Sequence, residues 1–193
     1  MAFQKQEIIP SIRHTGEFLE AAARGASCVL LSQSDMEELV KVQKVCRRMP
    51  HVQLMIHVDI LKGLSETAEA VAFLAAYIRP AAIISANPSV IAAAKKHGIP
   101  AIQRCFIFDE ESLGRSLRMV EHGAPDYIQV MPGLMPEVIR YMIKKTGRPV
   151  LAGGLIRTQE EAETARRAGA LAVTTSHKEL WENMADSTAA DEK

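Results

Sequence analysis

The chain has 193 residues, a length that fits one domain of ordinary size. Hydrophobic residues make up 48% and charged residues 24%, a balance typical of folded globular proteins that excludes a largely disordered chain. The 23 basic residues cancel the 23 acidic ones, so a uniformly basic nucleic-acid-binding protein is excluded, and any site for a polyanion must be a local patch.

Three features predict a cytoplasmic protein. The longest apolar run, Ala70–Ile78, has nine residues, whereas a membrane-spanning helix needs roughly 18 or more. The segment Met1–Glu7 lacks the apolar stretch of an export signal. The cysteines Cys28, Cys46 and Cys105 have no zinc-binding spacing, and we interpret them as reduced thiols in the core. We therefore expect no membrane partner and no metal site.

A helix-to-strand junction recurs five times: the end of a helix, a glycine and then a short apolar run. The glycines are Gly25, Gly98, Gly123, Gly147 and Gly169. Each is expected to close its helix in the left-handed conformation, and basic residues such as Lys95 and Lys144 precede them, where the helix dipole favours cations. The repeat indicates that helices and strands alternate along the chain.

The apolar runs predict eight strands, each followed by a helix. In chain order, the strands are expected near 8–12, 28–32, 52–59, 81–86, 100–108, 127–131, 149–154 and 171–175. The helices are expected near 15–24, 36–48, 66–78, 89–97, 112–122, 136–146, 159–168 and 178–184. Capping boxes of the S/T-x-x-E type at Ser34, Thr158 and Ser176 mark three of the helix starts. Strands this short and apolar are typical of parallel strands covered by helices.

This alternation predicts an α/β fold, a compact TIM-barrel-like (β/α)8 barrel. Barrels of this kind usually have about 250 residues, so the barrel is expected to have minimal loops or to be slightly incomplete. An open doubly wound sheet is the alternative fold. We expect residues 1–184 to form a single barrel domain and residues 185–193 to form a flexible C-terminal tail.

Polar residues of the segment Gln53–Asp59 are candidates for a ligand site. Period-two alternation points His57 and Asp59 into the barrel, with Asp59 near the carboxyl end of the strand, where barrels bind ligands. Asp59 either meets a polar ligand or pairs with a neighbour such as Arg104 or His57. Lys62 follows three residues later and either faces the mouth of the barrel or is a solvated loop lysine.

The ends of strands seven and eight predict a phosphate site. Gly153 and Gly154 let backbone amides approach an anion, and Thr175 and Ser176 supply hydroxyl groups before the last helix. Barrels often hold phosphate with the loops after these two strands. Ordinary turn and cap chemistry is the alternative interpretation of the same residues.

Seven segments, in order along the chain, resemble the glycerol uptake operon antiterminator regulatory protein family. They are His57–Leu64, Ile83–Ser85, Gln103–Arg104, Pro125–Ile128, Pro132–Pro136, Ala152–Ile156 and Thr175–Trp181. The resemblance implies a bacterial cytoplasmic regulator with a barrel-like fold that binds glycerol 3-phosphate. It also implies action on the leader mRNA of glycerol-utilisation genes, where the regulator prevents premature transcription termination.

The chain departs from the family pattern at three places. Gln129 replaces a common glutamate, Ala86–Pro88 replaces a more basic segment, and Glu137 replaces a common lysine. We expect glycerol 3-phosphate to be the regulatory ligand, with no other cofactor. The residues expected to hold its phosphate are Gly153, Gly154, Thr175 and Ser176. The residues expected to meet its hydroxyl groups are Asp59, Arg104 and Lys62.

The sequence does not assign the RNA-contacting residues. Basic patches on four predicted helices are candidates, and a solvated helix face explains each of them equally well. They are formed by Lys41, Lys44, Arg47 and Arg48; by Lys95 and Lys96; by Arg140, Lys144 and Lys145; and by Arg166 and Arg167. A homo-oligomer is compatible with the sequence, which does not specify the oligomeric state.

An enzyme is the alternative function. A small barrel aldolase, epimerase or isomerase acting on a phosphorylated triose or sugar would use Asp59 as its base. Lys62 is the one lysine near a strand end that could form a Schiff base. Because no nucleophile elbow, carboxylate pair or metal triad accompanies these residues, we assign no catalytic residue and favour a ligand-sensing regulator.

Overall fold

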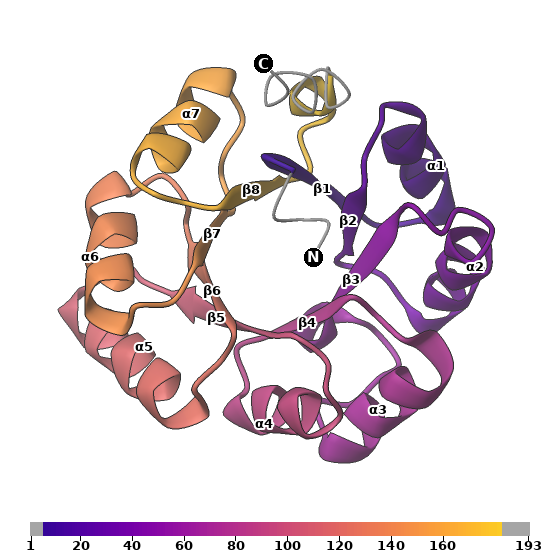
Figure 1. The fold of residues 1–193 in the computed structure, drawn as a ribbon, viewed down its shortest axis with the longest axis horizontal. Coiled ribbons are helices and arrows are strands. Elements are labelled where there is room, and N and C mark those ends of the chain that lie inside the picture. Colours follow the sequence, from indigo (N-terminus) through magenta and orange to yellow (C-terminus); the bar gives the residue numbers. More distant parts are fainter. Residues whose placement is uncertain (1–5, 183–193) are drawn as a thin grey trace.

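The structure, a computed structural model, describes residues 6–182 and shows eight parallel strands closed into a barrel (Figure 1). Each strand pairs with the next, and β1 pairs with β8 to close the ring. The strands are β1 (Ile8–Ile12), β2 (Cys28–Leu31), β3 (Gln53–His57), β4 (Ala82–Ser85), β5 (Ala101–Phe106), β6 (Tyr127–Met131), β7 (Val150–Gly153) and β8 (Ala172–Thr175). The TIM-barrel-like fold is therefore confirmed, and the open sheet is wrong.

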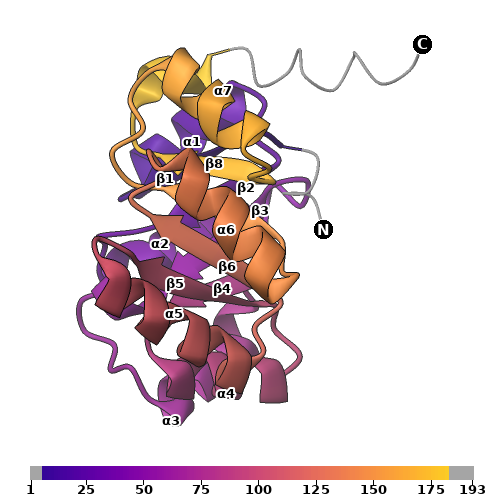
Figure 2. The same ribbon diagram turned by 90° about the vertical axis from the view of Figure 1, so that its left-hand side faces the viewer.

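Helices α1–α7 follow strands β1–β7 and surround the barrel (Figures 1 and 2). They are α1 (Thr15–Ala23), α2 (Met36–Cys46), α3 (Ala68–Phe73), α4 (Pro88–Lys96), α5 (Glu110–Gly123), α6 (Pro136–Thr146) and α7 (Gln159–Arg167). Helix α3 continues directly into a π-helical turn, η3 (Leu74–Ile78). None of the helices within residues 6–182 is long and apolar enough to cross a membrane.

The last element of the described residues is a 3-10 helix. Strand β8 leads into a 3-10 helix, η4 (Lys178–Trp181), where the sequence predicted a longer helix over 178–184. The expected tail, 185–193, lies outside the described residues. Within the described residues, η4 takes the place of the start of the predicted helix, and positions 183 and 184 of that helix also lie outside them.

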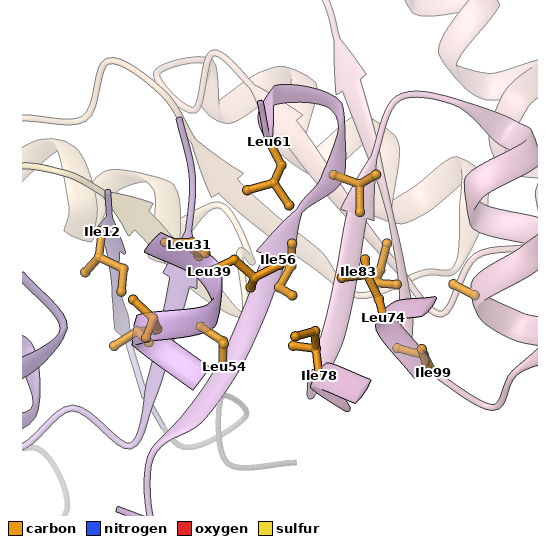
Figure 3. Close-up of a cluster of buried hydrophobic side chains, with 14 of the residues drawn as sticks. Ile12, Leu31, Leu39, Leu54, Ile56, Leu61, Leu74, Ile78, Ile83 and Ile99 are labelled. Carbon is orange, nitrogen blue, oxygen red and sulfur yellow. The ribbon is translucent and has the colours of Figure 1, made fainter. Parts of the chain in front are cut away.

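Two apolar layers stabilise the barrel. Side chains from the outer faces of β1–β4 pack against the surrounding helices. Figure 3 shows Ile56 and Ile83 from the strands with Leu39 of α2 and Leu74 of η3. Inside the barrel, a second cluster fills the axis. Its larger members are Ile9, Leu30, Met55, Ile84, Ile102, Tyr127 and Leu151. Because this inner cluster seals the axis, a ligand can enter only at an end of the barrel.

Four of the five predicted junction glycines take the expected left-handed conformation. Gly25, Gly98, Gly147 and Gly169 have positive φ angles, whereas Gly123 is the last residue of α5 and Ala124 takes the left-handed conformation instead. Three cysteines are free, with Cys28 and Cys105 buried and Cys46 half-buried. Residues 6–182 contain no group of three His, Cys, Asp or Glu side chains that could hold a metal ion.

One of the three predicted capping boxes marks the start of a helix, and the other two do not. Thr158 caps α7 and forms a reciprocal box with Glu161. Helix α2 is capped by Asp35, one residue after the predicted Ser34, because the carboxylate of Asp35 accepts from the backbone of Glu38. Ser176 caps no helix, since η4 begins two residues later without a side-chain cap.

Candidate functional site

A layer of polar side chains lies directly above the apolar interior. On six strands, the residue two positions after an interior apolar residue is polar, and alternation turns it inward. These residues are Ser11, Ser32, His57, Arg104, Gln129 and Thr174. They line a cavity of about 460 Å³ at the carboxyl ends of the strands, which we call the mouth. Barrels of this fold bind their ligands at this end.

Asp59 and Arg104 form a buried ion pair beside the mouth. The Nη2 atom of Arg104 lies 2.9 Å from Oδ2 of Asp59, and the two side chains are 10% and 6% exposed. The same carboxylate accepts hydrogen bonds from the Ser85 hydroxyl and from the backbone of Ala86, the latter at 2.7 Å. Asp59 is thus paired with a neighbour, which was one of the two interpretations of its sequence position. Its oxygen atoms are engaged, and its role in this geometry is to orient Arg104.

The position of Asp59 differs from the prediction in one respect. Strand β3 ends at His57, and Asp59 lies on the following 3-10 turn, η2 (Val58–Ile60), so the predicted strand over 52–59 is too long. The turn carries the Asp59 side chain toward β4, where Ser85 and Ala86 bind it. Alternation along a strand therefore does not set the direction of this carboxylate.

Arg104 supplies a fixed positive charge to the mouth. Its guanidinium carbon lies 4.4 Å from the centroid of the Phe106 ring, a cation–π contact on the same face of β5. Burial lowers the pKa of Arg104 and the neighbouring Asp59 carboxylate raises it, and a guanidinium remains charged at any physiological pH. A cation held in this way on two sides is preorganised for an anionic or hydroxyl-rich ligand.

His57 is uncharged at neutral pH. Burial, reinforced by the positive charge of Arg104, lowers the pKa of His57 to about 3. Its Nδ1 atom lies 3.3 Å from the Ser32 hydroxyl oxygen, and its Nε2 atom is 3.9 Å from the nearest oxygen of Asp59. The neutral ring can therefore donate or accept one further hydrogen bond.

Three buried polar atoms of the layer have no hydrogen-bond partner within residues 6–182. They are Nε2 of His57, Nε of Arg104 and Oε1 of Gln129. The Nε2 atom of Gln129 does have a partner, the Thr174 hydroxyl, at 2.9 Å. Because buried polar atoms are nearly always paired in native proteins, three unpaired atoms around one cavity favour a polar ligand there.

The glycines after β7 allow close packing beside the mouth. A Cβ atom on Gly153 would lie 2.6 Å from the Thr174 hydroxyl oxygen and 2.8 Å from Nε2 of Gln129. Gly154 has a φ of 77°, and a Cβ atom there would lie 2.9 Å from the end of the Met131 side chain. Gly153 therefore positions the polar layer, whereas Gly154 itself lines the cavity.

Thr175 and Ser176 have different surroundings. The Thr175 hydroxyl donates to the Ile156 carbonyl at 2.8 Å and accepts from the His177 backbone at 3.1 Å, so it joins the loops after β7 and β8. Its single proton is used in this contact. Ser176 is exposed and lines the cavity. The structure brings Gly154, Thr175 and Ser176 to the mouth, with Gly153 behind them.

Lys62 does not reach the cavity. Its backbone donates to the Ser34 carbonyl at 2.9 Å and accepts from Met36 at 3.1 Å, and its side chain is exposed. The cations among the lining residues are instead Arg13, Arg104 and Arg157. Sequence analysis missed Arg13 and Arg157, although each comes shortly after a predicted strand, in the loop that faces the mouth.

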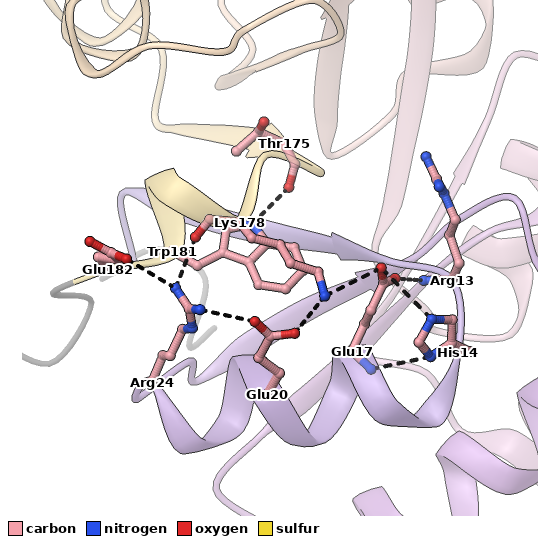
Figure 4. A network of polar contacts seen from close by, with 9 residues as sticks. All are labelled: Arg13, His14, Glu17, Glu20, Arg24, Thr175, Lys178, Trp181 and Glu182. Carbon is pink, nitrogen blue, oxygen red and sulfur yellow. Dashed lines mark hydrogen bonds and ion pairs between the residues drawn. The ribbon is translucent and has the colours of Figure 1, made fainter.

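The η4 turn fixes the loop after β8 against α1 (Figure 4). Trp181 is fully buried, and its indole Nε1 donates to the Thr175 carbonyl at 3.1 Å. Lys178 contacts Glu20 at 2.6 Å, and Arg24 bonds both Glu20 and the Lys178 carbonyl. The hydrogen bond from Lys178 lowers the pKa of the Glu20 carboxyl. These contacts link the mouth to a helix on the outside of the barrel.

Comparison with known proteins agrees with this architecture. A structure described as a glycerol uptake operon antiterminator regulatory protein, from Listeria monocytogenes, is 32% identical and covers 91% of this chain and 95% of its own, with a TM-score of 0.86. A glycerol uptake operon antiterminator-related protein from Thermotoga maritima is 30% identical, covers 91% and 98%, and has a TM-score of 0.79. The uncharacterized protein YgcP of Escherichia coli is 36% identical, over 65% of this chain and 66% of its own length.

More distant structures share the fold alone. An aldolase, QR15, is 14% identical over 97% of this chain and has a TM-score of 0.72. The model of one family, described as glycerol-3-phosphate responsive antiterminator, matches residues 8–181. Because this match spans every strand of the barrel and the polar mouth, the chain belongs to the glycerol-3-phosphate responsive antiterminator family.

Proposed function

We propose that the protein binds glycerol 3-phosphate at the mouth and, in that state, binds the leader mRNA of glycerol-utilisation genes and prevents premature termination. Membership of the family supports the regulatory role. The observation that carries the ligand assignment is the polar layer, in which three buried polar atoms lack partners beside a charged arginine. No other cofactor is needed for this function.

The phosphate group of the ligand lies against the loops after β7 and β8 in this proposal. Gly154 and Ser176 line the cavity there, and Arg157 adds a positive charge. Backbone amides of glycine-rich turns and arginine side chains are the groups that proteins use most often for phosphate. Gly153 and Thr175 contribute by positioning, because their contacts hold Thr174 and the two loops in place.

The glycerol hydroxyl groups lie deeper, over the polar layer. His57, Arg104 and Gln129 each present an unpaired polar atom to them. Asp59 acts through Arg104, whose guanidinium it orients. Lys62 is not part of this site, because it is absent from the cavity lining.

Isothermal titration calorimetry with glycerol 3-phosphate tests the proposal, with glycerol and inorganic phosphate as weaker comparators. Gly154→Asp should abolish binding, because it brings a carboxylate to the phosphate position at a backbone φ of 77°. Ser176→Ala, at an exposed residue, should weaken binding without loss of folding. Lys62→Ala is the matched control and should bind like the parent protein.

Two outcomes would contradict the proposal. If the Gly154→Asp and Ser176→Ala variants bind glycerol 3-phosphate as tightly as the parent protein does, the site lies elsewhere. Consumption of the ligand during the titration would instead favour a barrel enzyme. The structure lends that alternative little support, because both oxygen atoms of Asp59 are engaged and the cavity lining contains no lysine for a Schiff base.

Linkage gives a test of the regulatory step. If the ligand-bound protein binds RNA more tightly, RNA must strengthen ligand binding by the same factor. A titration of glycerol 3-phosphate with and without leader RNA measures one factor, and a titration of RNA with and without glycerol 3-phosphate measures the other. Equal ligand affinity in the two titrations would contradict gating by the ligand.

A further inference from the structure

The end of the barrel opposite the mouth carries a hollow between α2 and η3. It has a volume of about 510 Å³ and is lined by residues at the end of α2, at the start of β3 and at the end of η3. Gln43 and Arg47 come from the first of these, and Ile78 and Arg79 from the last. The amino ends of strands β3 and β4 form its floor, so it lies on the other side of the apolar interior from the ligand cavity.

The charged side chains that line the hollow are two arginines, Arg47 and Arg79. Residues 39–58 and 70–108 contain no aspartate or glutamate, although the chain as a whole is neutral. Lys44, Arg47, Arg48 and Arg79 lie in these stretches, and within residues 6–182 none of them forms an ion pair with a carboxylate. Arg47 and Arg79 line this hollow, whereas Lys44 and Arg48 line another one, between α1 and α2. Two arginines without acidic partners in one hollow favour an anionic occupant.

The backbone at Arg79 is strained. Arg79 closes η3 in the left-handed conformation, with a φ of 57° and a ψ of 58°. Four other helix-to-strand junctions of this chain use glycine for that conformation. The turn before Arg79 is π-helical, a form that is rare and frequent at functional sites. A glycine would relieve the strain, so the side chain of Arg79 can be removed by Arg79→Gly without adding backbone strain.

An exposed aromatic pair borders the hollow. Tyr77 is 64% exposed, and its ring centroid lies 5.1 Å from that of Phe73. The Nη2 atom of Arg47 donates to the Tyr77 carbonyl at 3.1 Å, which ties the guanidinium to this edge. Exposed aromatic rings beside arginines are the combination that proteins use to hold unpaired bases and their phosphates.

We infer that this hollow binds single-stranded RNA, with a phosphate between Arg47 and Arg79 and a base stacked on Tyr77. The inference rests on the proposed function and names the surface by which the protein meets its transcript. Because the hollow and the mouth lie at opposite ends of the barrel, RNA and glycerol 3-phosphate can be bound at the same time. Stacking and phosphate contacts accept any base, so the contact holds the strand and does not read its sequence.

Fluorescence anisotropy with a labelled, mixed-sequence single-stranded RNA of about 20 nucleotides, at saturating glycerol 3-phosphate, tests the inference. Arg79→Gly should melt at the same or a higher temperature than the parent, because glycine suits the left-handed conformation. It should nevertheless weaken RNA binding, and the slope of log K against log salt should fall by about 0.7, the loss of one phosphate contact.

Variants at Tyr77 separate stacking from charge. Tyr77→Ala should weaken RNA binding about tenfold, whereas Tyr77→Phe, which keeps the ring, should bind within about twofold of the parent. Lys62→Ala is the matched control for charge, because Lys62 is an exposed basic residue after η2, at the carboxyl ends of the strands, and does not line the hollow. It should leave the RNA affinity unchanged.

Three outcomes would overturn the inference. The first is unchanged RNA affinity in both Arg79→Gly and Tyr77→Ala, and the second is a parent protein that does not bind the oligonucleotide. The third is that these two variants sediment differently from the parent while their RNA affinity stays the same. That result would assign the hollow to contacts between copies of the chain. The glycerol 3-phosphate titration of the same variants decides separately on the proposed function, since the hollow contributes no residue to the mouth.

Discussion

The ion pair between Asp59 and Arg104 holds a buried charge in place, and removal of one partner should be costly. Asp59→Asn leaves the Arg104 guanidinium without its counter-ion, which should lower the free energy of unfolding by about 3 kcal/mol. Glu137→Gln is a matched control, because it breaks an exposed pair with Arg140 and should change stability by less than about 0.5 kcal/mol. Urea unfolding of both variants measures the difference, and equal losses would contradict the role of the pair.

His57 should make stability depend on pH. Burial lowers the pKa of His57 to about 3, below its ordinary value of 6.5, so between these values the unfolded chain binds a proton that the folded protein does not. Stability should therefore fall as the pH drops below 6.5, by up to about 1.4 kcal/mol per pH unit.

A variant isolates this contribution. Urea unfolding between pH 6.5 and pH 5, where most carboxyl groups stay ionised, should show a shallower slope for His57→Gln than for the parent. His51→Gln, at an exposed histidine, is the control and should keep the parental slope. A parental slope in both variants would mean that His57 becomes protonated within the folded protein.

The direction of single side chains was the hardest part of the site to predict. Adjacent residues of a strand face opposite sides, so a shift of one residue exchanges the two faces. Thr174 lies in the polar layer, whereas the predicted Thr175 holds two loops together. The partner of Arg104 was likewise open, because Asp59, Ser85 and Arg104 are far apart in the chain and meet only when the barrel closes.

At the scale of the elements, the short helix η4 contributes both to the apolar packing and to the position of the loop after β8. Trp181 is fully buried in the apolar cluster around β1–β4, and it also bonds the loop that faces the mouth. Trp181→Ala should lower the free energy of unfolding by about 3–5 kcal/mol and weaken glycerol 3-phosphate binding. Trp181→Phe keeps most of the apolar volume and removes the hydrogen bond to the Thr175 carbonyl, at a cost of about 0.5–1.5 kcal/mol. Calorimetry of both variants tests the link, and unchanged ligand affinity in Trp181→Ala would contradict it.

Strands were more predictable than helix ends in this chain. Each strand is an apolar run followed by a polar loop, and burial on both faces leaves few other arrangements. The helix ends depend on contacts between distant segments. Ala124 takes the left-handed position that Gly123 could have taken, and its backbone amide still closes α5 on Val120. The π-helical turn before Arg79 also has no signature that spacing alone reveals.

At the scale of the whole molecule, charge is separated along the barrel axis. Six helices carry acidic residues in their first turn, and four carry lysine or arginine in their last turn. Because all helices follow parallel strands, these ends gather at opposite faces of the barrel. A neutral protein of this kind still presents a basic face to polyanions.

Chromatography on heparin tests this separation. At pH 7 and low salt the protein should be retained despite its net charge of zero, and it should elute below about 0.5 M sodium chloride as salt screens the attraction. The double variant Arg47→Glu and Arg48→Glu should elute earlier than the parent. Passage of the parent through the column without retention would show that the separated charges do not produce a basic face.

The pairing of β1 with β8 has a consequence for how the protein is made. At about 5–20 residues per second, a ribosome synthesises β1 roughly ten to thirty seconds before β8. Until then the nascent sheet has two open edges, the feature of β-sheets that most readily recruits other chains. A polypeptide released before β8 would keep both edges exposed, so interrupted translation should yield aggregated fragments and no partly active regulator.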